Sequence, residues 1–383
     1  MLSRRTVSAI PLVPWQTGRV RNIVVLGSTG SIGRQALEVI EANPDRFRVV
    51  GLTAGGGHPD LLAEQVRRFG VEHVGGPDAN EQLAALPTAD VVLNAITGAA
   101  GLAATLAALN AGKTLALANK ESLVIGGHLV TDAAAPGQIV AVDSEHSAIA
   151  QALRSGRMSE VRRVILTASG GPFRGWTREQ LAGVTPQQAM RHPTWHMGRV
   201  ITINSATLVN KGLELLEASL LYGVPLDAIE VVVHPQSVVH SGVEFCDGAA
   251  ILQASPPDMK LPIALALAWP ERIPDAAPPC DWTQSAKWSF EPLDEQAFPA
   301  VALARRAGQA GGTAPAVFNA ANEVAVDAFC DGRLGFLGVT DTIGAVLEQH
   351  LRLSHVGDGR LTLDGVLAAD AWARDCARGV IST

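Results

Sequence analysis

The sequence has few aromatic residues and a low density of charge. Phe, Trp and Tyr make up 4% of its 383 residues, so it lacks the interleaved aromatic platform on which nucleic-acid bases stack. There are 30 Lys and Arg against 37 Asp and Glu, which gives a net charge of -7. That balance argues against nucleic acid and against an anionic membrane surface as partners. An anionic substrate would therefore need a local cationic pocket.

Cysteines and long apolar runs are also scarce. The four cysteines are far apart and form no C-x-x-C pair, which favours reduced thiols in a cytoplasmic protein over a disulfide framework or a zinc site. No run of about 18 apolar residues occurs, so no membrane span is expected. Residues 1–20 contain an apolar stretch that Pro11 and Pro14 interrupt, and no small-residue cleavage site. We interpret them as a loose extension and not as a secretory signal.

The first half of the chain alternates between strand and helix patterns. Asn22–Leu26 is a buried-strand pattern, followed by Gly27-x-x-Gly30-x-x-Gly33 and a helix up to Glu41. Such a turn lets the backbone approach a phosphate, which the helix N-terminus also attracts. The commoner nucleotide-binding motif is G-x-G-x-x-G, whereas this turn reads G-x-x-G-x-x-G. An ordinary glycine-rich turn without a nucleotide is therefore the alternative. Further strands at 47–53, 71–74, 89–96, 114–118 and 138–142, with helices at 60–69 and 102–110, predict a parallel, doubly wound sheet.

Two carboxylates stand where the strand at 138–142 gives way to a helix. Asp143 and Glu145 flank Ser144, and ligands of open α/β sheets bind beyond the carboxyl ends of the strands. Oxygen ligands of this kind suit magnesium or manganese. The alternative is that Ser144 caps the helix and the acids favour its dipole. A polar cluster at 119–122 ends the preceding strand, and helix capping would not explain its lysine, Lys120.

The second half of the chain offers further candidate ligand-binding residues. A strand at 161–167 leads into a turn of small residues around Ser169, which suits a phosphate. Residues 192–199 hold Trp195 in a loop, which fits either a lid or ordinary surface packing. Asn204 and Ser205 are predicted to cap a helix that carries Lys211 and Glu214 on one face, where a solvated ion pair is the alternative to a binding role.

The remaining segments indicate a sheet and then helices. Strands are predicted at 230–233 and 245–254, and residues 268–299 form a linker rich in Pro, Trp and Asp. Helices at 300–308, 316–330, 339–350 and 362–378 predict a small helical C-terminal domain.

Taken together, these stretches resemble the 1-deoxy-D-xylulose 5-phosphate reductoisomerases, NADPH-dependent enzymes of the non-mevalonate isoprenoid route. The resemblance runs from about residue 22 to the C-terminus, and the matching segments occur in the family's order. They are Gly27–Gly33, Ala118–Leu123, Val142–His146, Ala168–Phe173, His192–Gly198, Asn204–Glu217, His234–His240 and Asn319–Glu323.

The resemblance implies an α/β protein in several parts. An N-terminal extension (1–21) precedes a Rossmann-like NADPH-binding domain (22–143) and a central α/β catalytic and dimerisation domain (144–268). A linker (269–299) then leads to a C-terminal helical bundle (300–383). The family is homodimeric and acts on a small phosphorylated sugar.

The resemblance also implies three sets of site residues. A divalent cation (Mg2+, Mn2+ or Co2+) would be held by Asp143, Glu145 and Glu214. Substrate would be bound by Lys120, Ser144, Glu145, Ser169, His192, Trp195, Ser205, Asn210, Lys211 and Glu214, of which Lys120, Glu145, Glu214 and His192 count as catalytic together with Asp143. NADPH would be bound by Thr29, Gly30, Ser31, Ile32, Asn119, Glu121 and Gly198.

Nucleotide preference depends on the loop after the second strand. No Asp or Glu follows that strand before Asp60, so nothing there repels a 2′-phosphate. The family's basic residue is also missing, and Gly55, Gly56 and Gly57 stand there instead. Their backbone N–H groups could form an anion nest, with Ser28 or His58 assisting. We therefore expect NADPH to be preferred over NADH.

The implied reaction rearranges and reduces 1-deoxy-D-xylulose 5-phosphate to 2-C-methyl-D-erythritol 4-phosphate. One alternative is an NAD(P)-dependent polyol-phosphate dehydrogenase without rearrangement, which has no need of three metal carboxylates. Another is a catalytically silent NADP-binding regulator, which has no need of Lys120 either.

Overall fold

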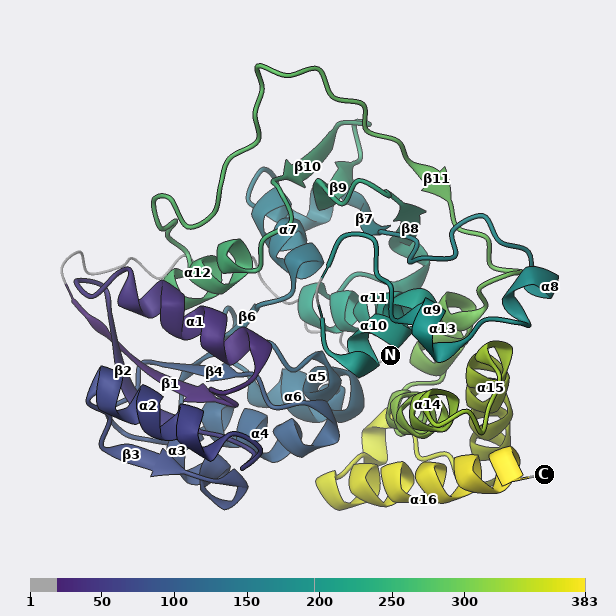
Figure 1. Cartoon of the computed structure of the whole chain (residues 1–383), viewed down its shortest axis with the longest axis horizontal. Helices are drawn as coiled ribbons and strands as arrows, with labels where there is room; N and C mark the ends of the chain where they lie inside the picture. The colour runs from purple at the N-terminus through teal and green to yellow at the C-terminus, as the bar shows by residue number, and fades with distance from the viewer. Residues whose placement is uncertain (1–18, 196, 383) are drawn as a thin grey trace. The chain divides into compact units, whose positions relative to one another are not determined.

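In the computed structural model, residues 19–195 and 197–382 are described, and they form two compact units (Figure 1). The first comprises residues up to Leu123, Val130–Gln151 and Asp258–Pro279. The second comprises Val124–Leu129, Ala152–Pro257 and the chain from Cys280 onward. The prediction for the N-terminal extension lies almost wholly outside the described residues. The division of the sequence into five parts stays a prediction.

The first unit is built on a six-stranded, wholly parallel sheet of order β3-β2-β1-β4-β5-β6. The order reverses between β1 and β4, and ligands of open α/β sheets bind in the crevice at such a point. The predicted doubly wound sheet is confirmed. Its strands are β1 (Arg21–Leu26), β2 (Phe47–Thr53), β3 (His73–Gly75), β4 (Val91–Asn94), β5 (Thr114–Leu117) and β6 (Ile139–Ala141).

Helices cover both faces of this sheet, which is why its central strands are apolar on both sides. On one face, side chains of β1 such as Ile23 and Val25 pack in one core with α1 (Ser31–Glu41), α2 (Pro59–Phe69) and α12 (Lys260–Ala268). Val24 points to the other face, where Leu83 of α3 (Asn80–Ala84) approaches it beside α4 (Leu102–Asn110).

Helix α12 is one of several elements that the sequence analysis did not predict. Its residues Pro262–Ala268 are all buried, and it packs against α1, β5 and β6. A helix that is apolar on every side carries no amphipathic periodicity, so the pattern that reveals a surface helix is missing. Far along the chain, this segment therefore completes the core of the first unit.

The second unit contains a five-stranded mixed sheet of order β10-β9-β7-β8-β11. Strand β7 runs parallel to β8 and antiparallel to β9. The prediction of one strand over 245–254 is wrong, because Asp247-Gly248 forms a turn, with Gly248 at φ +91°, that separates two strands. The strands are β7 (Val161–Ala168), β8 (Ile229–Val233), β9 (Val239–Phe245), β10 (Ala250–Ala254) and β11 (Glu291–Pro292).

Helices form the rest of the second unit. The four predicted C-terminal helices are confirmed to within four residues at each end. They are α13 (Ala300–Ala310), α14 (Ala314–Cys330), α15 (Phe336–Leu353) and α16 (Leu363–Ser382), and α10 (Arg199–Ala206) and α11 (Val209–Tyr222) precede them. Gly212 lets α11 approach α13 closely, because a Cβ there would lie 2.8 Å from that of Ala304.

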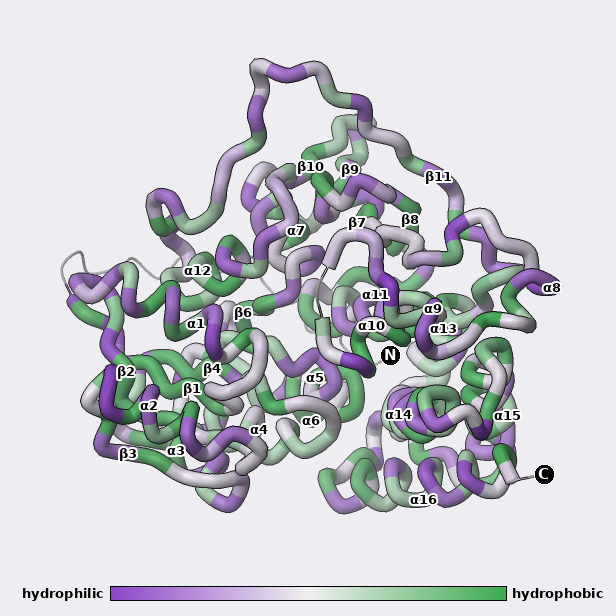
Figure 2. The backbone as a smooth tube through the Cα atoms, in the orientation of Figure 1, coloured by the Kyte–Doolittle hydropathy of each residue, from purple (hydrophilic) through white to green (hydrophobic). Residues whose placement is uncertain are grey.

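Hydropathy along α16 alternates between hydrophobic and hydrophilic stretches (Figure 2). Its buried residues are Val366, Ala369, Asp370, Ala373 and Ala377, at the spacing of one helix face. The remaining helices are shorter: α5 (Lys120–Gly126), α6 (His128–Ala133), α7 (Ser144–Leu153), α8 (Arg178–Leu181) and α9 (Pro186–Ala189). Among the described residues, no helix has the length and apolar character that crossing a membrane requires.

His350 of α15 lies in the interior of the C-terminal helices, only 1% exposed. Its Nε2 is 2.8 Å from Oγ1 of Thr313 and its Nδ1 is 3.0 Å from Oγ of Ser354. Burial, and secondarily the neighbouring His355, lower the pKa of His350 to about 4. The folded protein therefore keeps this ring neutral at pH values where an unfolded histidine takes up a proton.

This difference predicts acid sensitivity of the fold. Between about pH 6.5 and pH 4 the unfolded chain binds one more proton at His350, so the free energy of unfolding falls as pH falls, by up to about 3 kcal/mol. We expect His350→Gln to be less stable than the native protein at pH 7 but to lose less stability between pH 7 and pH 4.5. Urea unfolding at both pH values measures this, with the exposed His73→Gln as control. Equal acid sensitivity of His350→Gln and the native protein would contradict the assignment.

Candidate active site

The glycine turn between β1 and α1 is tightly packed against its own backbone and that of the loop after β4. Gly27 has φ +82°, and a Cβ there would lie 2.7 Å from the carbonyl oxygen of Ala95. A Cβ on Gly33 would lie 2.4 Å from the carbonyl oxygen of Gly27. Helix α1 begins at Ser31, so its first N–H groups lie at an exposed end of the turn. This geometry suits an anion at the helix N-terminus.

Ser28 is not available to a nucleotide phosphate. Its Oγ donates to Oε1 of Gln65 at 2.8 Å, and Nε2 of Gln65 donates back to the carbonyl oxygen of Ser28 at 3.0 Å. Both residues are buried, so this reciprocal pair fixes the turn to α2. The expectation that Ser28 assists a 2′-phosphate is therefore wrong. Gly55–Gly57 and His58, by contrast, are exposed, and Gly56 has φ +85°.

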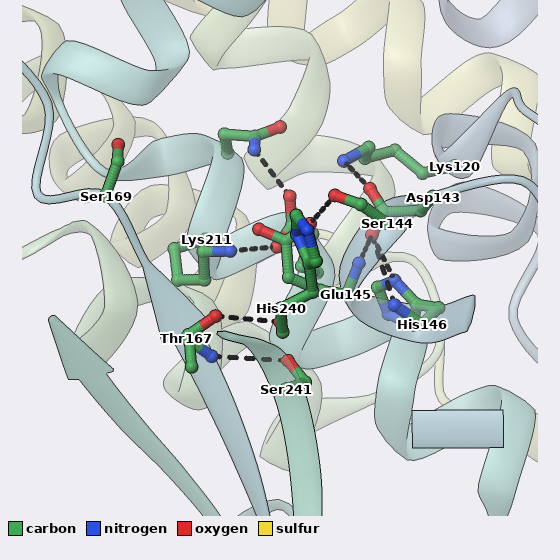
Figure 3. A network of polar contacts seen from close by, with 12 residues as sticks. Lys120, Asp143, Ser144, Glu145, His146, Thr167, Ser169, Lys211, His240 and Ser241 are labelled. Carbon is green, nitrogen blue, oxygen red and sulfur yellow. Dashed lines mark hydrogen bonds and ion pairs between the residues drawn. The ribbon is translucent and has the colours of Figure 1, made fainter. Parts of the chain in front are cut away.

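Asp143 organises the corner between β6 and α7 (Figure 3). Its Oδ1 accepts from the backbone N–H of Glu145 at 3.0 Å and of His146 at 3.3 Å. Its Oδ2 accepts from Nζ of Lys120 at 2.8 Å. The alternative in which Ser144 caps the helix is wrong, because Ser144 is already helical and Asp143 supplies the capping oxygen.

Lys120 reaches Asp143 because β5 and β6 are neighbours in the parallel sheet. Their carboxyl ends lie at the same edge, so the residues that follow each strand meet there. The side chains of Lys120 and Asp143 are only 12% and 14% exposed. Ser144 donates to Oε2 of Glu145 at 2.5 Å. The first unit thus brings together the predicted lysine, both acids and the serine.

His146 belongs to this corner and was absent from the predicted site. Its ring is buried, and its Nδ1 lies 2.9 Å from Oδ1 of Asp143. The signal was the spacing, since His146 follows Asp143 by three residues at the start of a helix, where such residues are neighbours.

Asn119 is buried and bonds within the fold. Its Nδ2 donates to the carbonyl oxygen of Gly98 at 2.9 Å and to that of Ile96, and its Oδ1 accepts from the backbone N–H of Ser122 at 2.8 Å. It therefore joins the loop after β4 to the start of α5. A nucleotide contact from Asn119 would come from its backbone.

In the second unit, α11 carries a buried charged cluster. Glu214 is 1% exposed and Lys211 4%. Nζ of Lys211 donates to Oε2 of Glu214, and Nδ2 of Asn210 donates to Oε1 at 2.5 Å. The alternative of a solvated ion pair is wrong, because both partners are buried. Charges removed from water in this way are costly unless they are compensated, which favours a functional role.

Ser205 lies near the end of α10 and does not cap α11. Helix α10 runs from Arg199 to Ala206, and Leu208, at φ +59°, separates it from α11. The predicted cap at Asn204 and Ser205 is therefore wrong. Leucine rarely adopts a left-handed conformation, so the sequence held no signal for this break.

Ser169 and His192 are brought together. Oγ of Ser169 lies 3.1 Å from Nε2 of His192, although 23 residues separate them. Burial lowers the pKa of His192. Trp195 lies beyond this pair, with its ring centroid 6.3 Å from that of His240, a buried residue of β9 that the predicted site lacked. The segment His234–His240, which resembles the family, could have indicated His240 as a site residue.

Comparisons with known proteins agree over nearly the whole chain. Three family models match: 1-deoxy-D-xylulose 5-phosphate reductoisomerase over residues 23–75 and 70–127, and its C-terminal domains over 139–222 and 254–376. The reductoisomerase of Cutibacterium acnes is 61% identical over 406 aligned residues, which cover 94% of this chain and 100% of that protein. The chain belongs to the 1-deoxy-D-xylulose 5-phosphate reductoisomerase family.

Other reductoisomerases support this assignment. The protein of Leifsonia xyli is 62% identical, with 94% of this chain and 98% of that protein covered. The reductoisomerase structure from Zymomonas mobilis, solved with NADPH, has a TM-score of 0.87 at 41% identity and covers 95% of this chain and 100% of that one. A reductoisomerase structure with NADPH, fosmidomycin and magnesium has a TM-score of 0.85 at 35% identity, with 95% and 98% covered.

The predicted family, its Rossmann-like α/β fold with C-terminal helices, and its class as NADPH-dependent oxidoreductases are confirmed. The alternative of a polyol-phosphate dehydrogenase is not favoured. NADPH and magnesium, the predicted cofactors, are bound in solved reductoisomerases. Within each unit, the structure groups the predicted residues into a carboxylate corner, a charged helix cluster and a Ser–His pair.

Proposed function

We propose that this chain converts 1-deoxy-D-xylulose 5-phosphate to 2-C-methyl-D-erythritol 4-phosphate with NADPH and a divalent cation. The observation that carries the proposal is the corner of Lys120 and Asp143. It lies at the carboxyl edge of the same parallel sheet that bears the nucleotide turn. A dehydrogenase needs the turn, whereas rearrangement of a carbon skeleton also needs the lysine and the carboxylates.

The cation would be held by Asp143, Glu145 and Glu214. All three residues supply carboxylate oxygens, which magnesium, manganese and cobalt bind. The burial of Glu214 is more easily explained if its carboxylate also meets a cation. The bound cation would polarise the hydroxy-ketone of the substrate. Lys120, held by Asp143, would supply a cation or a proton donor to the same oxygens, and Ser144 a hydrogen bond.

The phosphate of the substrate would be bound by Lys211 with Asn210, Ser169 and Ser205. In a chain of net charge -7, Lys211 supplies the local positive charge that a phosphate needs. Lys211 and Glu214 now neutralise each other. A phosphate at Lys211 and a cation at Glu214 would preserve that balance, so the two ligands fit the cluster together better than either does alone.

NADPH would be bound at the turn by Thr29, Gly30, Ser31 and Ile32, with Glu121, the backbone of Asn119, and Gly198. The 2′-phosphate would lie on the exposed backbone of Gly55–Gly57, since Ser28 is engaged with Gln65. Trp195 would cover the substrate and exclude water. The cytoplasmic location stays a prediction.

The reaction itself is the first test. The purified protein, incubated with 1-deoxy-D-xylulose 5-phosphate, NADPH and magnesium, should yield a branched polyol phosphate, identified by mass and by carbon connectivity in NMR. NADPH should give a higher kcat/KM than NADH. An unbranched product would favour a dehydrogenase, and the absence of NADPH oxidation would favour a regulator.

Replacement of Glu214 tests the cation site. Glu214→Gln keeps the size of the side chain and removes its charge, so we expect manganese affinity to fall at least tenfold and most activity to be lost. Calorimetric titration with manganese measures the affinity, with Glu230→Gln, a change on β8, as control. Unchanged affinity in Glu214→Gln would exclude it as a ligand.

We also propose that the chain forms a homodimer through β10. This strand is the edge of its sheet, and Ile251 and Leu252 are 39% and 40% exposed. Two more apolar residues, Trp282 and Phe290 in the segment between α12 and β11, are 75% and 45% exposed. An exposed apolar edge strand is a template for pairing with another chain. A second copy is the occupant expected, because the family is homodimeric.

The dimer is tested by a charge on that edge. Leu252→Lys should place an ammonium group in the interface and halve the mass measured by light scattering. Val74→Lys is a matched control, since Val74 is also 40% exposed but lies on β3, the edge strand of the other sheet. Dissociation by both variants, or by neither, would argue against β10 as the interface.

A further inference from the structure

The ring of His192 is engaged at both of its nitrogens. Nδ1 lies 3.1 Å from the backbone nitrogen of Thr194 and 2.9 Å from that of Trp195, and both of these nitrogens donate. A ring nitrogen that accepts from N–H groups carries a lone pair and no proton. The ring is therefore neutral, with its single proton on Nε2.

This tautomer decides the direction of the bond to Ser169. Nε2 of His192 donates, and Oγ of Ser169, 3.1 Å away, accepts. The same Oγ also accepts from the backbone N–H of Gly171 at 3.2 Å. A serine hydroxyl has two acceptor positions and one proton to donate. With both acceptor positions used inside the protein, the Ser169 hydroxyl is left as a donor, the polarity that a phosphate oxygen requires.

The position of this hydroxyl is set by close backbone packing. Gly170 and Gly171 have φ of +82° and +64°. A Cβ on Gly170 would lie 2.8 Å from the side chain of Val233, and one on Gly171 would lie 2.9 Å from the carbonyl oxygen of Ser205. The loop that carries Ser169 therefore lies directly against α10, which carries Ser205.

We infer that His192 is a positioning residue: its neutral ring orients the Ser169 hydroxyl as a hydrogen-bond donor to the substrate's phosphate and ties it to the turn at 192–195. The inference rests on the proposed function and replaces the predicted catalytic role of His192. In this role the ring transfers no proton. The ring also links the loop that carries Ser169 to the segment that carries Trp195. The residue that would contact the phosphate and the residue that would cover the substrate are therefore both held by His192.

Other roles for the same side chain predict different chemistry. A general acid would need a proton on the ring that it can lose, and a cationic phosphate ligand would need protons on both nitrogens. A proton on Nδ1 would face the N–H groups of Thr194 and Trp195, and burial lowers the pKa of the ring in addition. Both roles would require the turn to rearrange.

Two substitutions separate the two ends of the ring. In His192→Gln the amide nitrogen can take the place of Nε2 and still donate to Ser169. In His192→Asn the amide oxygen can take the place of Nδ1 and still accept from Thr194 and Trp195, but the bond to Ser169 is lost. We expect His192→Asn to raise KM about tenfold, as for loss of one hydrogen bond, with kcat nearly unchanged, and His192→Gln to raise KM less than threefold.

A double-mutant cycle with Ser169→Ala tests the link itself. If His192 acts through the Ser169 hydroxyl, His192→Asn should have almost no further effect on KM once Ser169→Ala is present. Additive effects would overturn the inference, as would a large fall in kcat in both His192→Gln and His192→Asn. Equal increases in KM in these two variants would point instead to a cationic contact with the phosphate.

The tautomer can be measured in the native protein without substrate, so this test does not depend on the proposed reaction. Nitrogen-15 NMR of histidine-labelled protein at pH 7 should show His192 with a lone-pair shift at Nδ1 and an N–H shift at Nε2. His192→Gln identifies the signal by its loss. A protonated ring, or the opposite tautomer, would overturn the inference even if the product assay succeeds.

Discussion

The carboxylate of Asp143 is the interaction on which the candidate site depends. One of its oxygens caps α7 through two backbone N–H groups, and the other holds Nζ of Lys120. A single side chain thus ends β6, starts a helix and fixes a lysine from the neighbouring strand. Because both oxygens are engaged within the fold, the corner is ordered before any ligand binds, which reduces the entropy that binding must overcome.

Ionisable side chains removed from water recur in this chain. Lys211 and Glu214 are almost fully buried on α11, where an apolar pair would pack at lower cost. Their retention is explained if each meets a charged ligand, and this connects the helix cluster with the carboxylate corner in chemical terms. His192 shows a different solution, a half-buried ring that stays neutral and only directs a hydrogen bond.

Much of the fold was readable from local patterns. Apolar runs and glycine turns predicted the parallel sheet because its central strands are buried on both faces, and the four C-terminal helices followed from their periodicity. Among the features that were not predicted, three have a clear physical reason. Helix α12 is apolar on all sides, β9 and β10 are separated by one Asp-Gly turn, and a left-handed leucine separates α10 from α11. None of these three features produces a periodic pattern of apolar residues in the sequence.

By itself, the sequence determined the family and indicated candidate residues for its chemistry. The acids, the lysines, the glycine turn and their order along the chain were sufficient to identify the family. Only the tertiary structure decided how those groups are used: Ser28 is engaged with Gln65, Asp143 and not Ser144 caps α7, and His192 donates to Ser169. The reason is physical. Residue type fixes what a side chain can donate, accept or ionise, but only neighbours from distant parts of the chain fix its burial, its tautomer and its partner.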